Sequence, residues 1–174
     1  MDKRFCKEAE LSRFMKFSDY RWNGVGNDGY GGVLAPSASG DYRDVQRFVL
    51  FGGREDVRFH FRYFEVGPGG YSRLEKHRHA HCVLGLRGRG RLIMGRETFD
   101  LGFMDAAYIA PDVPHQLINE TGDPFGFFCA VDAERDDPRP LDDGELAALL
   151  SDPVIGPLIR TGEAFSCELN RPSS

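Results

Sequence analysis

The sequence predicts an all-β fold with a short helix near its C-terminus. Twenty-one glycines and ten prolines are spread among short apolar runs, which is typical of many strands joined by turns. Hydrophobic residues make up 41% of the 174 residues and include 14 phenylalanines, enough to bury a substantial core in one domain. No apolar run approaches the roughly 20 residues that a membrane-spanning helix needs, so we expect a soluble protein.

Residues 1–43 are expected to form an irregular extension. Tyr20, Trp22 and Tyr30 lie there among glycines, and the small-residue run 36–40 follows them. A flexible tail usually lacks such aromatic residues. We therefore expect the extension to pack, either on its own domain or on a partner subunit. Both alternatives are open at this point, and we predict a homodimer.

Residues 44–132 are predicted to form a β-barrel. Segments rich in glycine and proline separate the apolar runs, as expected for antiparallel hairpins. These turn signals lie at 52–53, 67–70, 88–90, Gly95 and 121–124. The runs predicted as strands are 46–50, 57–66, 82–86, 91–94, 107–109, 116–119 and 126–131.

Residues 133–174 are predicted to form a loop and a helix that pack on the barrel. Three acidic residues precede the apolar run 146–150, and acidic residues favour a helix N-terminus. They are Asp142, Asp143 and Glu145. A further apolar run, 154–159, is expected to pack on the outside of the barrel.

Composition also restricts the partners and the compartment. The net charge of −5 and the pI of about 5.5 argue against a nucleic-acid-binding surface. The basic run 87–91 alternates arginine with glycine, which indicates a solvated hairpin or an anchor for an anionic substrate. Four cysteines without a C-x-x-C pair favour a reducing, cytoplasmic setting. Two of them, Cys82 and Cys129, lie on predicted strands and are weaker candidates for a pocket.

Four of the five histidines gather around one carboxylate. Residues 75–81 read Glu-Lys-His-Arg-His-Ala-His, and His115 follows further along the chain. Imidazole and carboxylate groups are ligands that suit first-row transition metals. The cluster therefore predicts one divalent transition metal per chain. We prefer Fe2+, with Mn2+, Ni2+, Zn2+ and Cu2+ as alternatives.

The spacing of this cluster resembles the first motif of the cupin superfamily. In that family a glycine is followed after five residues by His-x-His, then after three or four residues by glutamate, and after six more by glycine. The residues at these positions here are Gly69, Glu75, His77, His81 and Gly88. Glu75 thus stands where the family usually has histidine, and His81 stands where it usually has glutamate.

A second stretch resembles the second cupin motif, G-D-x-x-x-I-P-x-G-x-x-H-x-x-x-N. The matching residues are Asp105, Tyr108, Ile109, Pro111, Pro114, His115 and Asn119, and the departures are Met104, Ala110 and Asp112. The resemblance covers residues 55–132 and implies a double-stranded β-helix, also called a jelly-roll barrel. It also implies a metal held by Glu75, His77, His81 and His115. Cupins are commonly dimeric, which fits the predicted homodimer.

The run from Glu75 to His81 must contain a turn. Its alternate residues would face one way on a straight strand, but at roughly 3.3 Å per residue they would be too spread out to share one metal. We therefore expect a turn between Arg78 and Ala80 that returns His81 to His77 and leaves His79 outside the ligand set.

An alternative register takes His77 and His79 as the His-x-His pair and Gly90 as the closing glycine. This register puts Val83 at the carboxylate position and leaves three ligands when His115 is included. We prefer the register with four ligands because it fills every ligand position.

The predicted function is a metal-dependent enzyme that acts on a small, oxygen-rich, anionic metabolite. Three histidines and one carboxylate leave coordination positions open for a substrate. Among cupin reactions we prefer a dioxygenase over a lyase or isomerase. The candidate catalytic residues are Tyr71 and Tyr108, and the candidate substrate-binding residues are Arg62, Arg87 and Arg91. The alternative is a non-catalytic binding or sensory module with a structural metal.

Overall fold

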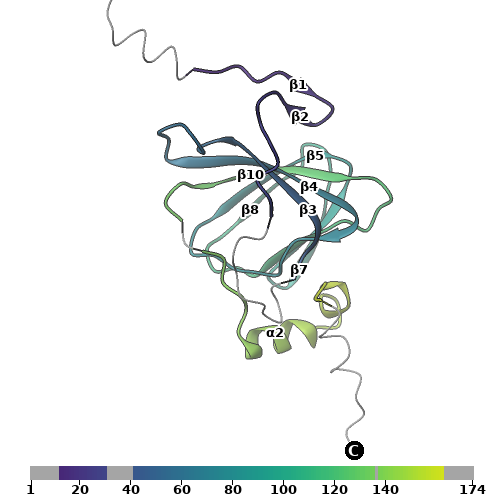
Figure 1. The fold of residues 1–174 in the computed structure, drawn as a ribbon. Coiled ribbons are helices and arrows are strands. Elements are labelled where there is room, and N and C mark those ends of the chain that lie inside the picture. The colour runs from purple at the N-terminus through teal and green to yellow at the C-terminus, as the bar shows by residue number, and fades with distance from the viewer. Residues whose placement is uncertain (1–11, 31–40, 136, 163–174) are drawn as a thin grey trace, which may run out of the picture.

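The computed structural model describes residues 12–30, 41–135 and 137–162. Its strands wrap into a barrel, with the β1–β2 hairpin at one end and helix α2 at the other (Figure 1). The elements are β1 Phe17–Ser18, β2 Arg21–Trp22, β3 Arg43–Phe51, β4 Phe59–Tyr71, β5 His81–Arg87, β6 Gly90–Met94, β7 Glu97–Leu101, β8 Ala106–Ile109, β9 His115–Ile118, β10 Phe125–Asp132, α2 Asp143–Leu150 and a 3-10 turn, Gly156–Leu158. The all-β prediction is confirmed. Parts of the predicted N-terminal and C-terminal regions, with Cys6 and Cys167, lie outside the described residues.

The eight strands β3 to β10 form one continuous antiparallel ladder that folds into the two sheets of a barrel, joined through β4 and β9. Strand β4 pairs with β3 and with β10, and β10 continues to β5 and β8. The second sheet has the order β7-β6-β9. The two sheets join where Tyr71 at the end of β4 pairs with Ile118 of β9. This is the jelly-roll arrangement that the cupin resemblance implies.

The chain that follows β4 stays beside β9. Ser72 donates its backbone N–H to the Leu117 carbonyl oxygen at 2.8 Å, and Glu75 and His115 exchange two backbone hydrogen bonds. Because of this continued pairing, residues 75–77 of the first histidine stretch lie next to the start of β9, which carries the second.

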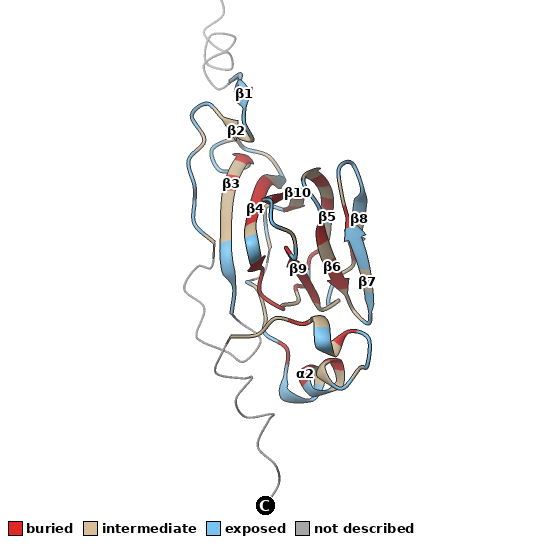
Figure 2. Ribbon diagram, turned by 90° about the vertical axis from the view of Figure 1, so that its right-hand side faces the viewer, coloured by how far each residue is buried: buried red, intermediate tan, exposed pale blue. Residues whose placement is uncertain are grey.

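Strand β4 carries apolar residues on both faces. Phe64 and Val66 belong to the core inside the barrel, whereas Phe61 and Tyr63 belong to a cluster on the outer face. Figure 2 shows most of β4 buried, in contrast to the exposed strand β7 at the far edge. Trp22 covers the outer face of β4, with its ring centroid 5.2 Å from that of Tyr63. The described part of the N-terminal extension therefore packs on its own barrel.

Helix α2 begins in a capping box. The Asp142 side chain accepts a hydrogen bond from the Glu145 N–H, and the Glu145 carboxylate accepts one from the Asp142 N–H. Leu146 and Leu149 are buried in a cluster with Tyr71 on the outside of the barrel. The predicted helix is confirmed and begins slightly earlier than expected. Within the described ranges, no helix combines the length and hydropathy needed to cross a membrane.

One predicted turn is wrong. Residues 67–70 lie inside β4, where the register against β3 shifts between Arg43 and Val45. The glycines there produce a bulge instead of a chain reversal. Gly70 permits the close approach, because a Cβ at this position would lie 2.7 Å from the Arg43 carbonyl oxygen.

Two further turn signals were assigned to the wrong kind of connection. Residues 88–90 and 121–124 join strands that do not pair with each other, so they are crossovers between the sheets and not hairpins. The sequence prediction also missed β7. This edge strand buries Leu101 alone among its five residues, so it lacks the alternation that marks a strand in sequence.

Glu65 ties the N-terminal extension to the outer face of β4. Its carboxylate accepts hydrogen bonds from Arg21 at 2.9 and 3.2 Å, from Arg87 at 2.7 Å and from the Tyr63 hydroxyl at 2.9 Å. Burial raises the pKa of Glu65, but these hydrogen bonds outweigh burial and hold the pKa below its ordinary value.

We expect Glu65→Gln to lower the free energy of unfolding at pH 7 by about 2 kcal/mol, because it leaves two partly buried arginines without their counter-ion. A carboxylate whose pKa is lowered by folding stabilises the protein above its ordinary pKa of 4.5, and this stabilisation is lost as the pH falls through the lowered pKa. The difference from wild type should persist from neutral pH to about 4.5 and vanish below it. Urea titrations across this range measure the difference. Equal losses in Glu65→Gln and in the exposed control Glu97→Gln would contradict the prediction.

Candidate metal centre

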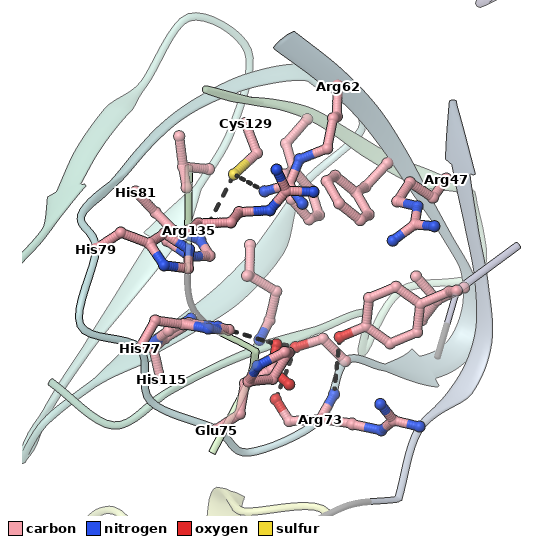
Figure 3. A pocket seen from close by; sticks show the side chains of 18 of the residues that line it. Arg47, Arg62, Arg73, Glu75, His77, His79, His81, His115, Cys129 and Arg135 are labelled. Atoms are coloured by element: carbon pink, nitrogen blue, oxygen red, sulfur yellow. Dashed lines mark hydrogen bonds and ion pairs between the residues drawn. The ribbon is translucent and has the colours of Figure 1, made fainter. Parts of the chain in front are cut away.

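A cavity of about 480 Å³ opens into the barrel. One part of its wall carries four histidines, which are His77, His79, His81 and His115. Glu75, four arginines and the thiol of Cys129 line other parts of the same cavity (Figure 3). The polar residues that face the interior of the barrel thus gather in one place.

Three of the histidines turn ring nitrogens toward one another. His77, His81 and His115 each offer one nitrogen, and these nitrogens all lie within 4.8 Å of each other. The ring centroids of His77 and His81 are 4.6 Å apart, and those of His81 and His115 are 4.9 Å apart. The chain bends at residues 78–79, within the predicted turn, and so brings His81 back beside His77.

The ring nitrogens are prepared to bind a cation. His115 Nδ1 lies 2.9 Å from the Val113 carbonyl oxygen, which places the proton on Nδ1 and leaves Nε2 free for the cluster. His77 is buried, and neither of its ring nitrogens makes a hydrogen bond of good geometry among the described residues, although Nε2 lies 3.3 Å from Glu75 Oε1. Unpartnered buried nitrogens are unfavourable, so a metal ion fits this position.

Electrostatics favours the neutral imidazoles that metals require. Burial lowers the pKa of His81, and the neighbouring charges of His115, His77 and Arg62 lower it further. Burial also lowers the pKa of His115. Because a metal binds the unprotonated nitrogen, these shifts favour the metal-binding form of His81 and His115.

The fourth ligand has two candidates. Glu75 Oε1 lies 3.3 Å from His77 Nε2. Glu75 is therefore close enough to the histidines to bind the same metal, and its role as a ligand stays a prediction. His79, which we expected outside the set, also faces the cavity, and its Nε2 lies 3.1 Å from His81 Nε2. Two nitrogens bound at about 2.1 Å to one octahedral metal lie about 3 Å apart. His79 therefore competes with Glu75 for the fourth position.

The predicted substrate-binding arginines separate in the structure. Arg62 on β4 lines the cavity. Arg87 pairs with Glu65 on the outer face of the barrel, and Arg91 donates to Glu120 at 2.8 Å on the surface. Arg62 alone of the three can reach a ligand in the cavity.

The two predicted catalytic tyrosines do not line the cavity. Tyr71 is buried beside helix α2, with its hydroxyl 3.4 Å from Asp41 Oδ2. Tyr108 is 61% exposed on the edge strand β8. Successive residues of a strand face opposite sides of the sheet. On β8 it is Ala107 and Ile109 that contact the core, so Tyr108 faces outward.

Sequence reasoning missed three arginines that line the cavity: Arg47, Arg73 and Arg135. For Arg47 the signal is strand pairing, because it stands opposite the inward-facing Phe64 in the register of β3 against β4. Such a signal is available only when the pairing partner is known.

Cys129 also faces the cavity, and Cys82 on the neighbouring strand β5 is exposed. The Cys129 Sγ accepts a hydrogen bond from Arg62 Nη2 at 3.3 Å and lies 3.6 Å from His81 Nδ1. Burial raises the pKa of the Cys129 thiol, and the Arg62 guanidinium acts against this rise. The cavity therefore joins a thiol to the histidine cluster.

Comparisons with known proteins agree with this fold and site. A model of the cupin domain family matches residues 62–131. A 1-methylthio-D-xylulose 5-phosphate methylsulfurylase from Rhodospirillum rubrum is 40% identical over 138 residues, which are 79% of this chain and 85% of that protein.

Solved structures give the same result. A cupin-2 domain from Rhodospirillum rubrum has 40% identity and a TM-score of 0.71, covering 81% of this chain and 91% of that one. A cupin 2 conserved barrel domain protein from Rhodopseudomonas palustris has 36% identity and a TM-score of 0.76, covering 86% of this chain and all (100%) of that one. The two jelly-roll sheets, the two motifs and these relatives lead to one conclusion, that the chain belongs to the cupin superfamily.

Proposed function

We propose that this chain is a metal-dependent cupin enzyme that removes the methylthio group from a 1-methylthio-2-ketose phosphate. The observation that carries the proposal is the position of the Cys129 thiol in the same cavity as the histidine cluster. The 40% identity to a methylsulfurylase of this substrate class supports it.

Cys129 is the proposed acceptor of the methylthio group. Arg62 already donates to its sulfur, and a histidine that binds a metal through Nε2 carries its proton on Nδ1. With a metal in place, His81 Nδ1 would therefore be a second donor toward the sulfur, across the observed 3.6 Å. Both donors favour the thiolate, which is the nucleophilic form of cysteine.

The proposed transfer is balanced in atoms and electrons. The Cys129 sulfur attacks the methylthio sulfur, the bond from that sulfur to C1 breaks, and its electron pair stays on C1 beside the C2 carbonyl. C1 then takes up one proton, equal to the proton that the thiol has lost, and becomes a methyl group. C1 is thereby reduced, while Cys129 is oxidised to a methyl disulfide. A divalent metal at the histidines would polarise the C2 carbonyl oxygen.

A free thiol from solution completes the cycle. Its sulfur attacks the methylthio sulfur of the disulfide, restores Cys129 as a thiol and leaves as a mixed methyl disulfide. The sum of the two steps converts the methylthio ketose and one thiol into the deoxy ketose and one disulfide.

Dioxygenase chemistry, preferred from the sequence, has no specific support among these relatives, and neither does a lyase or isomerase reaction at comparable identity. Methylthio removal takes its place as the proposal because it rests on a relative with 40% identity. Fe2+ as the preferred metal and the homodimer are retained as predictions. Elemental analysis and light scattering of the purified protein measure these two properties.

The test is turnover of 1-methylthio-D-xylulose 5-phosphate by the purified, metal-loaded protein with a small thiol such as 2-mercaptoethanol. We expect mass spectrometry to show the 1-deoxy ketose phosphate and the mixed methyl disulfide in equal amounts, both absent after chelation of the metal. Consumption of O2 without a need for thiol would instead establish a dioxygenase. Binding of the compound without any product would establish the binding module.

A further inference from the structure

Three arginines form one side of the cavity. Arg47 comes from β3, Arg62 from β4, and Arg135 from the segment that follows β10. In Figure 3 they lie on the upper side of the cavity, whereas Glu75 lies on the lower side. The same three arginines also line a second cavity of about 440 Å³. We call Arg47, Arg62 and Arg135 the arginine cluster.

Among the residues that the structure describes, Arg62 carries a buried charge without a counter-ion. The residue is 7% exposed, its Nη2 donates to the thiol of Cys129, and its Nε is buried without a hydrogen-bond partner. Among the described residues, no carboxylate forms an ion pair with it. The Arg62 guanidinium lies over the Phe64 ring at 5.1 Å, but a buried charge without an opposite charge beside it remains unfavourable. An anion that enters the cavity would remove this cost.

The neighbouring groups add positive charge. Arg135 Nη1 lies 3.1 Å from His60 Nδ1, and its carbonyl acceptors are Asp132 and Ala133 at 3.4 Å. Burial lowers the pKa of Arg135, and the charges of Arg62 and Arg47 lower it further, which shows that the cluster repels itself.

The negative charge nearby lies at the exposed edge of the cluster. Arg47 pairs with Asp28 at 2.9 Å, but the Asp28 side chain is 56% exposed and Arg47 Nε remains buried without a partner. Asp137 lines the exposed rim of the first cavity. These carboxylates leave the buried side of the cluster positive.

We propose that the arginine cluster binds the phosphate monoester of the substrate, at the side of the cavity that adjoins Cys129. Guanidinium groups match phosphate oxygens in geometry and charge. Arg62 links the two functions, because it belongs to the cluster and also donates to the Cys129 sulfur. The identification of the ligand as a sugar phosphate rests on the proposed function, whereas the anion site rests on the arginines themselves.

The probe is inorganic phosphate, titrated calorimetrically into the purified protein with and without a chelator. We expect Arg135→Gln and Arg62→Gln to weaken phosphate binding about tenfold, because each removes a charged hydrogen-bond donor. The exposed control Arg89→Gln should bind phosphate as wild type does. Arg135→Lys should recover part of the affinity, since it restores the charge without the planar geometry.

Thermal melting separates this role from a structural one. Arg62→Gln removes a buried unpaired charge, so it should not lower the Tm of the phosphate-free protein, while the rise in Tm on adding phosphate should shrink. A large loss of Tm without phosphate would show that Arg62 is structural and overturn its part in the site.

Two outcomes overturn the proposal as a whole. One is phosphate binding that is equal in wild type, Arg135→Gln and Arg89→Gln. The other is binding that disappears with the chelator, which would place the phosphate on the metal. Failure of the proposed function is distinguishable, because an arginine-dependent phosphate site without methylthio turnover rejects the reaction and leaves the anion site established. Turnover in Arg135→Gln with an unchanged KM shows that the substrate phosphate does not bind at the arginine cluster, and it overturns that assignment.

Discussion

His115→Gln is expected to abolish tight binding of the divalent metal and to lower turnover about a thousandfold, since even an indirect ligand contact can contribute 10- to 100-fold. His115 is buried on β9, its Nδ1 is held by the Val113 carbonyl, and its other nitrogen faces the histidine cluster. Glutamine keeps most of the volume but replaces the imidazole, and with it the nitrogen that would bind the metal, by a carboxamide. Metal content by elemental analysis and the initial rate of methylthio removal measure the two effects.

The control for this variant is wild-type protein treated with a chelator. If His115 acts through the metal, the chelated wild type and His115→Gln should have the same residual rate. A variant that keeps one metal per chain at wild-type affinity would remove His115 from the ligand set and with it the centre described above.

The same metal titration assigns the fourth ligand. Glu75 lies opposite His115 across a backbone bridge, and His79 approaches His81 through ring nitrogens 3.1 Å apart. The family spacing predicts that Glu75→Gln weakens metal binding more than His79→Gln does. The reverse order would give the fourth position to His79.

Cys129→Ser is expected to lower methylthio removal by about 10⁴-fold or more, since removing one member of a catalytic unit costs about 10⁴ to 10⁶ in rate, while metal affinity changes little. The hydroxyl of serine keeps the size of the site but is a far weaker nucleophile toward sulfur than a thiolate. Steady-state rates with saturating thiol measure the loss. Cys82→Ser on the adjacent strand is the matched control. Because Cys82 is exposed, this variant should remove the methylthio group at the wild-type rate.

A second measurement tests the intermediate itself. Without any free thiol, one equivalent of substrate should leave wild-type protein heavier by one methylthio group in place of a hydrogen, and peptide mapping should locate it at Cys129. Full activity in Cys129→Ser would show that the external thiol attacks the substrate directly, and the covalent step would have to be abandoned.

The candidate metal ligands were predictable because their evidence is largely local in sequence. The spacing from Gly69 through Glu75, His77 and His81 matches a known motif, and the need for a turn inside the run follows from the length of a strand. The bend at residues 78–79 and the meeting of His77, His81 and His115 agree with that reasoning. The helix Asp143–Leu150 was predictable for a similar reason, since its acidic cap precedes it directly.

The arginines and tyrosines were not predictable because their position depends on which face of a strand is inside. Alternation tells which residues of a strand share a face, but it identifies the inner face only when the other face is polar. Strand β4 has Phe64 and Val66 inside, yet Phe61 and Tyr63 outside under the N-terminal extension. With apolar residues on both faces, sequence cannot tell that Arg62 points inward.

By itself, then, the sequence determined the all-β class, the cupin family and three histidines that could hold a metal, because the spacing of residues within motifs encodes all three. Only the tertiary structure decided that Arg47, Arg135 and Cys129 face the same cavity as those histidines. It also placed Tyr71, Tyr108, Arg87 and Arg91 outside that cavity. The physical reason is strand pairing, since contacts between β3, β4 and β10 set the direction of each side chain, and this pairing joins segments far apart in the chain.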